Sequence, residues 1–355
     1  MQPPFRLYGA ENSAFSQKLL TYLRYKGFEH TYIPRTVANA AEFSRLARLP
    51  LIPLLVEADG RTAQDSTQIM ERLDAASPVP AARPEDPALG FVASLIEDWA
   101  DEWLNKISLY YRWADDNERK AAAKAAVDAM YPDSPPEGAA EIVAARMAAK
   151  LPVAGAGPDN GAALEAAFKD AVALLDGCLL TRPFLFGGLP TSADFAIAAQ
   201  LNQLQKAVRP AAILHDATWL SAYLVRMQAP QPAEGAAYET LASLEPTLAP
   251  LLSRQIGAIY LAFAEANAQT QASGGAISLD ILGHPFAQGP QRYAARAFQE
   301  LRRKRAQMPE HDALTALLDT AGCDLPLRMP VSALVAQSSE PSAEEDTIGE
   351  EDEQD

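Results

Sequence analysis

Cysteine is scarce in this chain, with only Cys178 and Cys323 among 355 residues. A chain of this length held together by disulfides would need more of them, so the sequence predicts a protein of the reducing cytoplasm. A structural zinc site needs about four ligands. Two distant cysteines and four scattered histidines do not supply such a set. We therefore expect neither a disulfide framework nor a bound metal.

Long apolar runs and excess positive charge are also missing. No run of about 18 apolar residues occurs, and the first residues have no basic head before an apolar stretch, so we expect neither a membrane span nor a secretory signal. The net charge is −16, and nine acids lie in residues 337–355, which contain no Lys or Arg. The rest of the chain is also acidic, which argues against nucleic acid, because phosphates need basic partners. The tail, 331–355, is expected to be disordered, with partner binding as the alternative.

The first 77 residues alternate between two kinds of element. Apolar runs predict strands, and spacings of three and four predict helices between them. The strand candidates are 5–8, 30–34 and 51–57, and the helix candidates are 13–26, 39–49 and 65–74. Gly27 follows the first helix, as a C-terminal glycine should. This order predicts an α/β domain over residues 1–77.

Prolines then mark a linker over residues 78–90, because proline at high density stops helices. A chain of 355 residues suggests about two domains, and an apolar content of 48% allows sizeable cores. After the linker, helical spacing dominates and predicts an all-helical domain over 91–330. The predicted helices are 91–113, 162–180, 191–208, 219–227, 244–271 and 291–308, with a loose insertion at 132–161 and a Gly-rich turn region before the last helix.

One face of the helix predicted over 91–113 is acidic. It carries Glu97, Asp98, Asp101 and Glu102. We interpret these residues as a solvent-exposed face, which is the usual place for charges on an amphipathic helix. A metal site is the alternative interpretation.

Ser13 stands at the turn between the first strand and the first helix. Its side chain can accept a hydrogen bond from a free backbone N–H of that helix. The helix end also has open donors and partial positive charge, which stabilise a nearby anion. If that anion is a thiolate, its pKa falls. The structural alternative is that Ser13 is only a helix cap.

Two further motifs occur in the α/β part. Pro53 follows Ile52 at the start of a buried apolar run, which suits a turn into a strand, although sequence alone does not establish a cis bond. Gln64, Asp65 and Ser66 precede a helix. Asp65 or Ser66 can cap that helix, and its backbone donors can bind a carboxylate. A simple helix start is the alternative.

In this order, the three motifs resemble the glutathione transferase family. The resemblance implies a thioredoxin-like first domain and an all-helical second domain. Ser13 stands where serine-type members, such as the theta and zeta classes, have their catalytic serine. The resemblance further implies that Ile52 and Pro53 hold the cysteinyl part of glutathione. It assigns the γ-glutamyl part to Asp65 and Ser66, and it adds Phe15 and Gln64 to the residues that bind glutathione.

The helical part supports the same resemblance. Thr191 and Asp194 form a capping box before an apolar run, and the segment 184–188 precedes it. The family has such a box in its C-terminal domain. The segments 101–104 and 111–113 look like a bacterial branch of uncharacterised glutathione-transferase-like proteins. The resemblance covers residues 5–228 well and extends more loosely to 308.

The resemblance implies an enzyme that adds the glutathione thiolate to an apolar electrophile, as in detoxification, and that forms a homodimer. Glutathione is then a co-substrate, and no cofactor is expected. Candidates to line the second-substrate pocket are Phe15, Tyr110, Tyr111 and Trp113, with a core role as the alternative for these aromatic residues. A non-catalytic scaffold of the same fold and a glutathione-dependent isomerase or dehalogenase are the alternative functions. Disulfide exchange is excluded, because no cysteine stands at the helix start.

Overall fold

The computed structural model describes residues 1–328, so the predicted acidic tail lies outside the described residues. The chain begins with an α/β unit that contains the three predicted strands. Its elements are β1 (Phe5–Gly9), α1 (Ala14–Tyr25), β2 (His30–Pro34), a 3₁₀ turn η1 (Val37–Asn39), α2 (Ala40–Leu46), β3 (Leu54–Val56), β4 (Thr62–Gln64) and α3 (Ser66–Ala76). The short edge strand β4 was not predicted, because its three residues carry no distinct apolar alternation.

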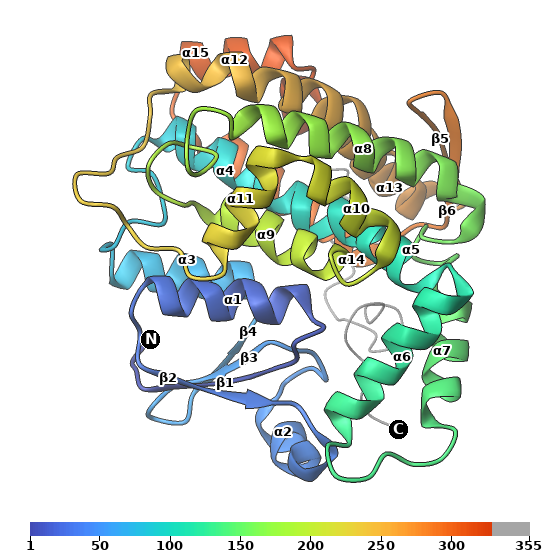
Figure 1. Ribbon diagram of the computed structural model, residues 1–355. Helices are drawn as coiled ribbons and strands as arrows, with labels where there is room; N and C mark the ends of the chain where they lie inside the picture. The colour runs from blue at the N-terminus through green and yellow to red at the C-terminus, as the bar shows by residue number, and fades with distance from the viewer. Residues whose placement is uncertain (329–355) are drawn as a thin grey trace.

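The four strands form one sheet in the order β2-β1-β3-β4. β1 and β2 are parallel, whereas β3 pairs antiparallel with both β1 and β4. Successive side chains of a strand point to opposite faces, so Leu7 belongs to the large core and Tyr8 to a small one around Phe43. Figure 1 shows α1 and α3 between the sheet and the helical part, and α2 on the other side. The predicted thioredoxin-like layering is confirmed.

The first long helix of the helical part begins earlier than predicted. α4 (Pro87–Trp99) starts at Pro87 because the Asp86 carboxylate accepts a hydrogen bond from the backbone N–H of Ala88 and proline suits the first helical position. The helix continues through the π-helical segment η2 (Ala100–Leu104) into α5 (Asn105–Trp113). The proline-rich connection is therefore shorter than the predicted linker.

Most of the remaining chain is helical, as predicted. The elements that follow are α6 (Asp116–Met130), α7 (Ala139–Lys150), a 3₁₀ turn η3 (Pro158–Asn160), α8 (Gly161–Cys178), α9 (Ser192–Leu204), α10 (Val208–Asp216), α11 (Thr218–Met227), α12 (Leu241–Leu251), the π-helical η4 (Leu252–Leu261), α13 (Ala262–Ser273), α14 (Arg292–Gln307), α15 (Asp312–Thr320) and α16 (Asp324–Arg328). The segment predicted as a loose insertion contains α7, which packs against α6. Among residues 1–328, no helix combines the length and apolarity needed to cross a bilayer.

A β-hairpin replaces the predicted Gly-rich turn region. β5 (Ile277–Ile281) and β6 (His284–Gln288) pair antiparallel. The two-residue turn between them has positive φ at both Leu282 and Gly283, which is the backbone twist that tight hairpins favour. Ile277 and Ile281 alternate with exposed residues, and this alternation is the sequence signal that could have identified the first strand.

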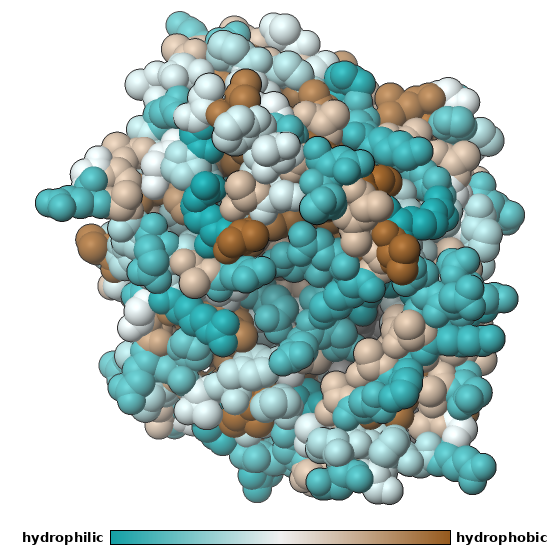
Figure 2. All heavy atoms as spheres, viewed as in Figure 1, coloured by the Kyte–Doolittle hydropathy of each residue, from teal (hydrophilic) through white to brown (hydrophobic). Residues whose placement is uncertain are grey.

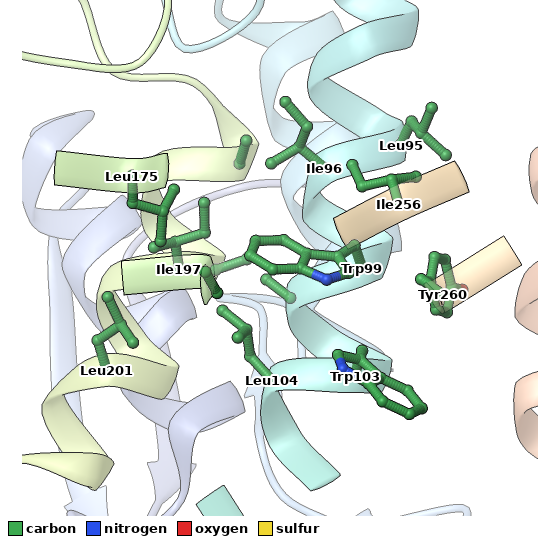
Figure 3. Close-up of a cluster of buried hydrophobic side chains, with 14 of the residues drawn as sticks. Leu95, Ile96, Trp99, Trp103, Leu104, Leu175, Ile197, Leu201, Ile256 and Tyr260 are labelled. Carbon is green, nitrogen blue, oxygen red and sulfur yellow. The ribbon is translucent and has the colours of Figure 1, made fainter. Parts of the chain in front are cut away.

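One core unites the early and late helices. Trp99 and Trp103 of the α4–η2 helix are fully buried. Figure 3 shows Trp99 between side chains of α8 and α9 on one side and Ile256 of η4 on the other. The segment after residue 228 therefore shares the core of the preceding helices.

Candidate functional site

The sheet register brings the three predicted motifs to the same end of the sheet. Tyr8, near the end of β1, pairs with Leu54 at the start of β3, and Leu54 pairs with Gln64 at the end of β4. The same end of the sheet therefore carries the loop 10–13, residues 52–53 and residues 64–66.

Ser13 caps α1 as predicted. Its backbone is extended, with φ −93° and ψ 117°, and its Oγ accepts a hydrogen bond of 3.2 Å from the backbone N–H of Ser16. Ser13 is 8% exposed. The turn that leads to it needs Gly9, because a Cβ there would lie 2.9 Å from the Cβ of Ser16. The cap is confirmed, whereas action of the hydroxyl on a thiolate stays a prediction.

The segment before β3 is held by Gln64. The bond between Ile52 and Pro53 is cis, and both residues are buried. The Gln64 amide donates to the carbonyl oxygens of Leu49 at 2.8 Å and Leu51 at 2.7 Å. Its oxygen accepts from the backbone N–H groups of Arg48 at 3.1 Å and Leu49 at 3.0 Å. These four bonds use the full capacity of an amide, so Gln64 shapes this loop, and its predicted contact with glutathione is untested.

Asp65 has an unusual backbone conformation. It caps α3, and its carboxylate accepts from the backbone N–H of Gln68 at 3.2 Å and from the side-chain amide of Gln68 at 3.1 Å. Its φ is 76°, a value that few residues other than glycine adopt. Such outliers cluster at functional sites. Burial raises the pKa of the Asp65 carboxyl. Ser66, 5% exposed, is the first residue of α3.

The acidic face of the α4–η2 helix is buried at two positions, so the interpretation as a solvent-exposed face is wrong there. Lys18 of α1 is 1% exposed, and its Nζ lies 2.6 Å from Glu97 Oε1 and 2.5 Å from Asp101 Oδ2. The same Nζ donates to Thr67 Oγ1 at 3.0 Å. Thr67 follows Ser66 on α3, so this network links the start of α3 to the helical part. Within residues 1–328, no group of three or more His, Cys, Asp or Glu side chains is arranged to hold a metal.

Burial sets the charge states of these acids. It raises the pKa of Asp101 to about 6, against the opposing effect of Lys18. It also raises the pKa of Asp98 to about 7, although the Tyr260 hydroxyl donates a hydrogen bond to that carboxylate. Burial would also raise the pKa of Glu97, but Lys18 overrides it and holds that pKa below its usual value. The charges of Lys18 and Glu97 therefore compensate each other inside the protein.

Three of the four aromatic residues predicted for a second-substrate pocket are buried. Tyr110, Tyr111 and Trp113 are 9%, 4% and 5% exposed. The Tyr110 hydroxyl donates to Glu165 Oε1 of α8 at 2.7 Å, and Tyr111 packs edge-on against Phe168 of α8. These contacts favour the core interpretation.

Phe15, in the first turn of α1, is half-buried. It is thus the most accessible of the four predicted pocket residues, and its pocket role stays a prediction.

Three side chains of the helical part hold the loop before Ser13. Arg112 Nη1 donates to the carbonyl oxygen of Asn12 at 3.2 Å. Gln203 Nε2 at 2.9 Å and Lys206 Nζ at 2.8 Å both donate to the carbonyl oxygen of Glu11. Sequence reasoning missed this role, because the three residues lie about 100 to 195 positions from the loop they contact. Arg112 lies in a segment used for the resemblance, but nothing local indicated its target.

Comparisons with known proteins agree on the two parts of the chain. Residues 7–82 match the model of the glutathione S-transferase N-terminal domain, and residues 138–226 match that of the C-terminal domain. No curated protein matches the chain.

Among solved structures, the chain is similar to the β-etherase LigF from Sphingobium sp. strain SYK-6, with 23% identity, a TM-score of 0.47, and 64% of this chain and 96% of that one covered. It is also similar to a glutathione S-transferase from Methylobacterium radiotolerans in complex with glutathione sulfonate, with 18% identity, a TM-score of 0.42, and 66% and 96% covered. A glutathione S-transferase from Rhodospirillum rubrum F11 has 19% identity, a TM-score of 0.42, and 69% and 91% covered.

Proposed function

We propose that this protein is a serine-type glutathione transferase, a proposal supported by the match of residues 7–82 and 138–226 to the models of the N- and C-terminal domains of the glutathione S-transferase family. It adds the glutathione thiolate to an electrophilic small molecule. The observation that carries the proposal is the place of Ser13 at the N-terminus of α1, at the same end of the sheet as Pro53 and Ser66.

The proposed chemistry begins with the thiol proton leaving to solvent. The Ser13 hydroxyl donates a hydrogen bond to the resulting thiolate, since a hydroxyl can accept from Ser16 N–H and donate elsewhere at the same time. The open N–H groups and partial positive charge of the α1 N-terminus add to the stabilisation. The sulfur lone pair then forms a bond to the electrophilic carbon, and the leaving group departs with its bonding electrons. Residues 52–53 and 65–66 are the proposed contacts of the cysteinyl and γ-glutamyl parts.

The test replaces Ser13 by Ala and measures conjugation of glutathione with chloro-dinitrobenzene. A hydrogen bond to a charged group contributes about 1.5–3 kcal/mol, so kcat/KM should fall roughly 10- to 150-fold. The ultraviolet absorbance of the bound thiolate, followed against pH, should show a pKa about one to two units higher. Ser13→Thr keeps the hydroxyl and should retain most of the activity. Ser16→Ala is the matched control, because Ser16 is fully buried on the same helix turn.

Two results would remove the Ser13 mechanism: unchanged turnover in Ser13→Ala, or an equal loss in Ser16→Ala. Calorimetric titration with glutathione tests the alternative of a non-catalytic scaffold. Absence of binding at millimolar glutathione would favour the scaffold. Two structural observations also favour it: the Gln64 amide is hydrogen-bonded within the protein, and Ser13 has little exposed surface. A glutathione-dependent isomerase or dehalogenase would use the same site, and assays with such substrates distinguish it. We further propose a cytoplasmic homodimer, which light scattering tests.

A further inference from the structure

We propose that Arg112 and Lys206 form an anion-binding subsite beside Ser13, and that the electrophile accepted there carries a negatively charged group such as a carboxylate. This inference rests on the proposed function and names the class of its second substrate. It changes the expectation of an apolar co-substrate into that of an electrophile with an anionic end.

The two cations converge on consecutive carbonyl oxygens. Arg112 comes from α5 and binds the carbonyl of Asn12, whereas Lys206 comes from the residues after α9 and binds the carbonyl of Glu11. The Arg112 guanidinium also lies 5.8 Å from the centre of the Trp113 ring, which helps to fix its orientation. Both cations are therefore anchored within two residues of Ser13.

Neither cation is in direct contact with an acid, although the charge of the Glu11 carboxylate acts on Lys206 from farther away and opposes the fall of its pKa. Within residues 1–328, neither Arg112 nor Lys206 forms an ion pair with a carboxylate. Desolvation of the Lys206 ammonium against the loop, together with the charge of Arg112, lowers its pKa to about 8. Two cations held close together with only carbonyl partners repel each other, and a bound anion relieves that repulsion.

Arg112 and Lys206 have more N–H donors than the hydrogen bonds they make to the loop. A guanidinium has five N–H donors and an ammonium has three, while the loop takes one bond from each. Arg112 is half-buried, and Lys206 is exposed. A planar guanidinium with spare donors suits a carboxylate or a similar oxyanion.

The wall beside the cations is polar as well. Gln203 is 1% exposed and donates to the same Glu11 carbonyl as Lys206, but its Oε1 has no hydrogen-bond partner among the described residues. An unpartnered buried acceptor calls for a hydrogen-bond donor, which an ionised carboxylate does not supply, so this oxygen is not itself a contact of the anion. Figure 2 shows that hydrophilic side chains predominate over α1 on the viewed face. This surface suits a charged co-substrate better than a purely apolar one.

The subsite also lies on the sulfur side of the proposed glutathione site. The pair contacts the loop that ends at Ser13, where the thiolate would sit. The residues proposed for the γ-glutamyl part, 65–66, follow β4 at the other side of β3 in the sheet order. A charged group held by the pair would therefore belong to the partner of the thiolate.

The experiment compares two electrophiles that differ by one charge, chloro-dinitrobenzoate and chloro-dinitrobenzene, with the full-length protein. The measured quantity is the ratio of their kcat/KM values. In Arg112→Gln and in Lys206→Gln this ratio should fall about tenfold, which is the lower end for a hydrogen bond to a charged group at an accessible site. Arg112→Lys should retain part of the ratio, because it keeps the charge. Lys120→Gln removes an exposed charge from α6 and should leave the ratio as in the unmodified protein.

The ratio separates the subsite from loop positioning, because a displaced loop slows both reactions equally. A ratio that stays constant in both variants overturns the proposal. So does an equal rise of the KM for glutathione with both electrophiles, since the pair would then serve the tripeptide itself.

If the unmodified protein conjugates neither electrophile, the proposed function fails separately. In that case titration with the two dinitrophenyl glutathione conjugates, with and without the carboxylate, measures the subsite directly. Tighter binding of the carboxylate form that is lost in Arg112→Gln supports the proposal, and equal binding of the two conjugates overturns it.

Discussion

Replacing Lys18 by Met should destabilise the protein strongly near neutral pH. The change keeps a side chain of similar length but leaves Glu97 and Asp101, which are 3% and 9% exposed, without their shared cation. Removing one partner of a buried ion pair costs about 3–5 kcal/mol. At about 2.1 cal/mol/K per residue, the 328 described residues have an unfolding entropy of about 0.7 kcal/mol/K. The melting temperature should therefore fall by roughly 4–7 °C.

The loss should shrink as the pH falls. In the unmodified protein the pKa of Glu97 is held low, so its contribution to stability is present at neutral pH and is lost on acidification. In Lys18→Met the effect of burial on Glu97 and Asp101 is no longer opposed by Lys18, so both pKa values should rise. Asp101 already has a pKa of about 6 with Lys18 present. Protonation removes the uncompensated charges, so the variant gains stability relative to the unmodified protein as the pH falls through 6 and below.

The assay is thermal unfolding followed by circular dichroism at about pH 7.5 and about pH 5. Lys124→Met is the matched control, because Lys124 pairs with Asp128 on the surface of α6, where the two side chains are 71% and 49% exposed. Exposed pairs of this kind contribute about 0–1 kcal/mol, so the control should melt within about 1.5 °C of the unmodified protein at both pH values. An equal deficit of Lys18→Met at the two pH values, or a deficit no larger than that of the control, would refute the reasoning.

Two glycine substitutions and the two thiols give further predictions. Gly257→Ala should destabilise by about 1–3 kcal/mol in urea unfolding, since its Cβ would lie 2.2 Å from the carbonyl oxygen of Ala321. Gly177→Ala in α8 meets nothing within 4 Å and should stabilise by about 0.5–1 kcal/mol, so equal effects of the two substitutions would contradict the packing argument. Burial raises the pKa of both Cys178 and Cys323 to about 12. A disulfide reagent should therefore label the native protein only as fast as it unfolds, and rapid labelling in native buffer would show that one thiol is accessible.

The order of elements was predictable because its signals are local. A cap such as Ser13, a C-terminal glycine such as Gly27 and the capping box of Thr191 with Asp194 each act within a few residues of chain. These motifs, together with apolar periodicity, predicted the α/β unit, the helical part and the residues of the candidate site. The hairpin over 277–288 was not predicted, because short strands next to glycines resemble a plain turn.

The environment of the site depended on tertiary packing. Lys18 and Asp101 are 83 positions apart, and only the approach of Lys18 from α1 turns a helix face that the sequence suggests is solvent-exposed into part of a buried ion pair. Arg112 and Lys206 reach the loop before Ser13 from 100 and 195 positions away. Local sequence determines which backbone segments form helices and caps, because those preferences act between neighbours. Burial and charge pairing join residues that meet only when the two parts of the chain pack, so the folded structure alone decided them.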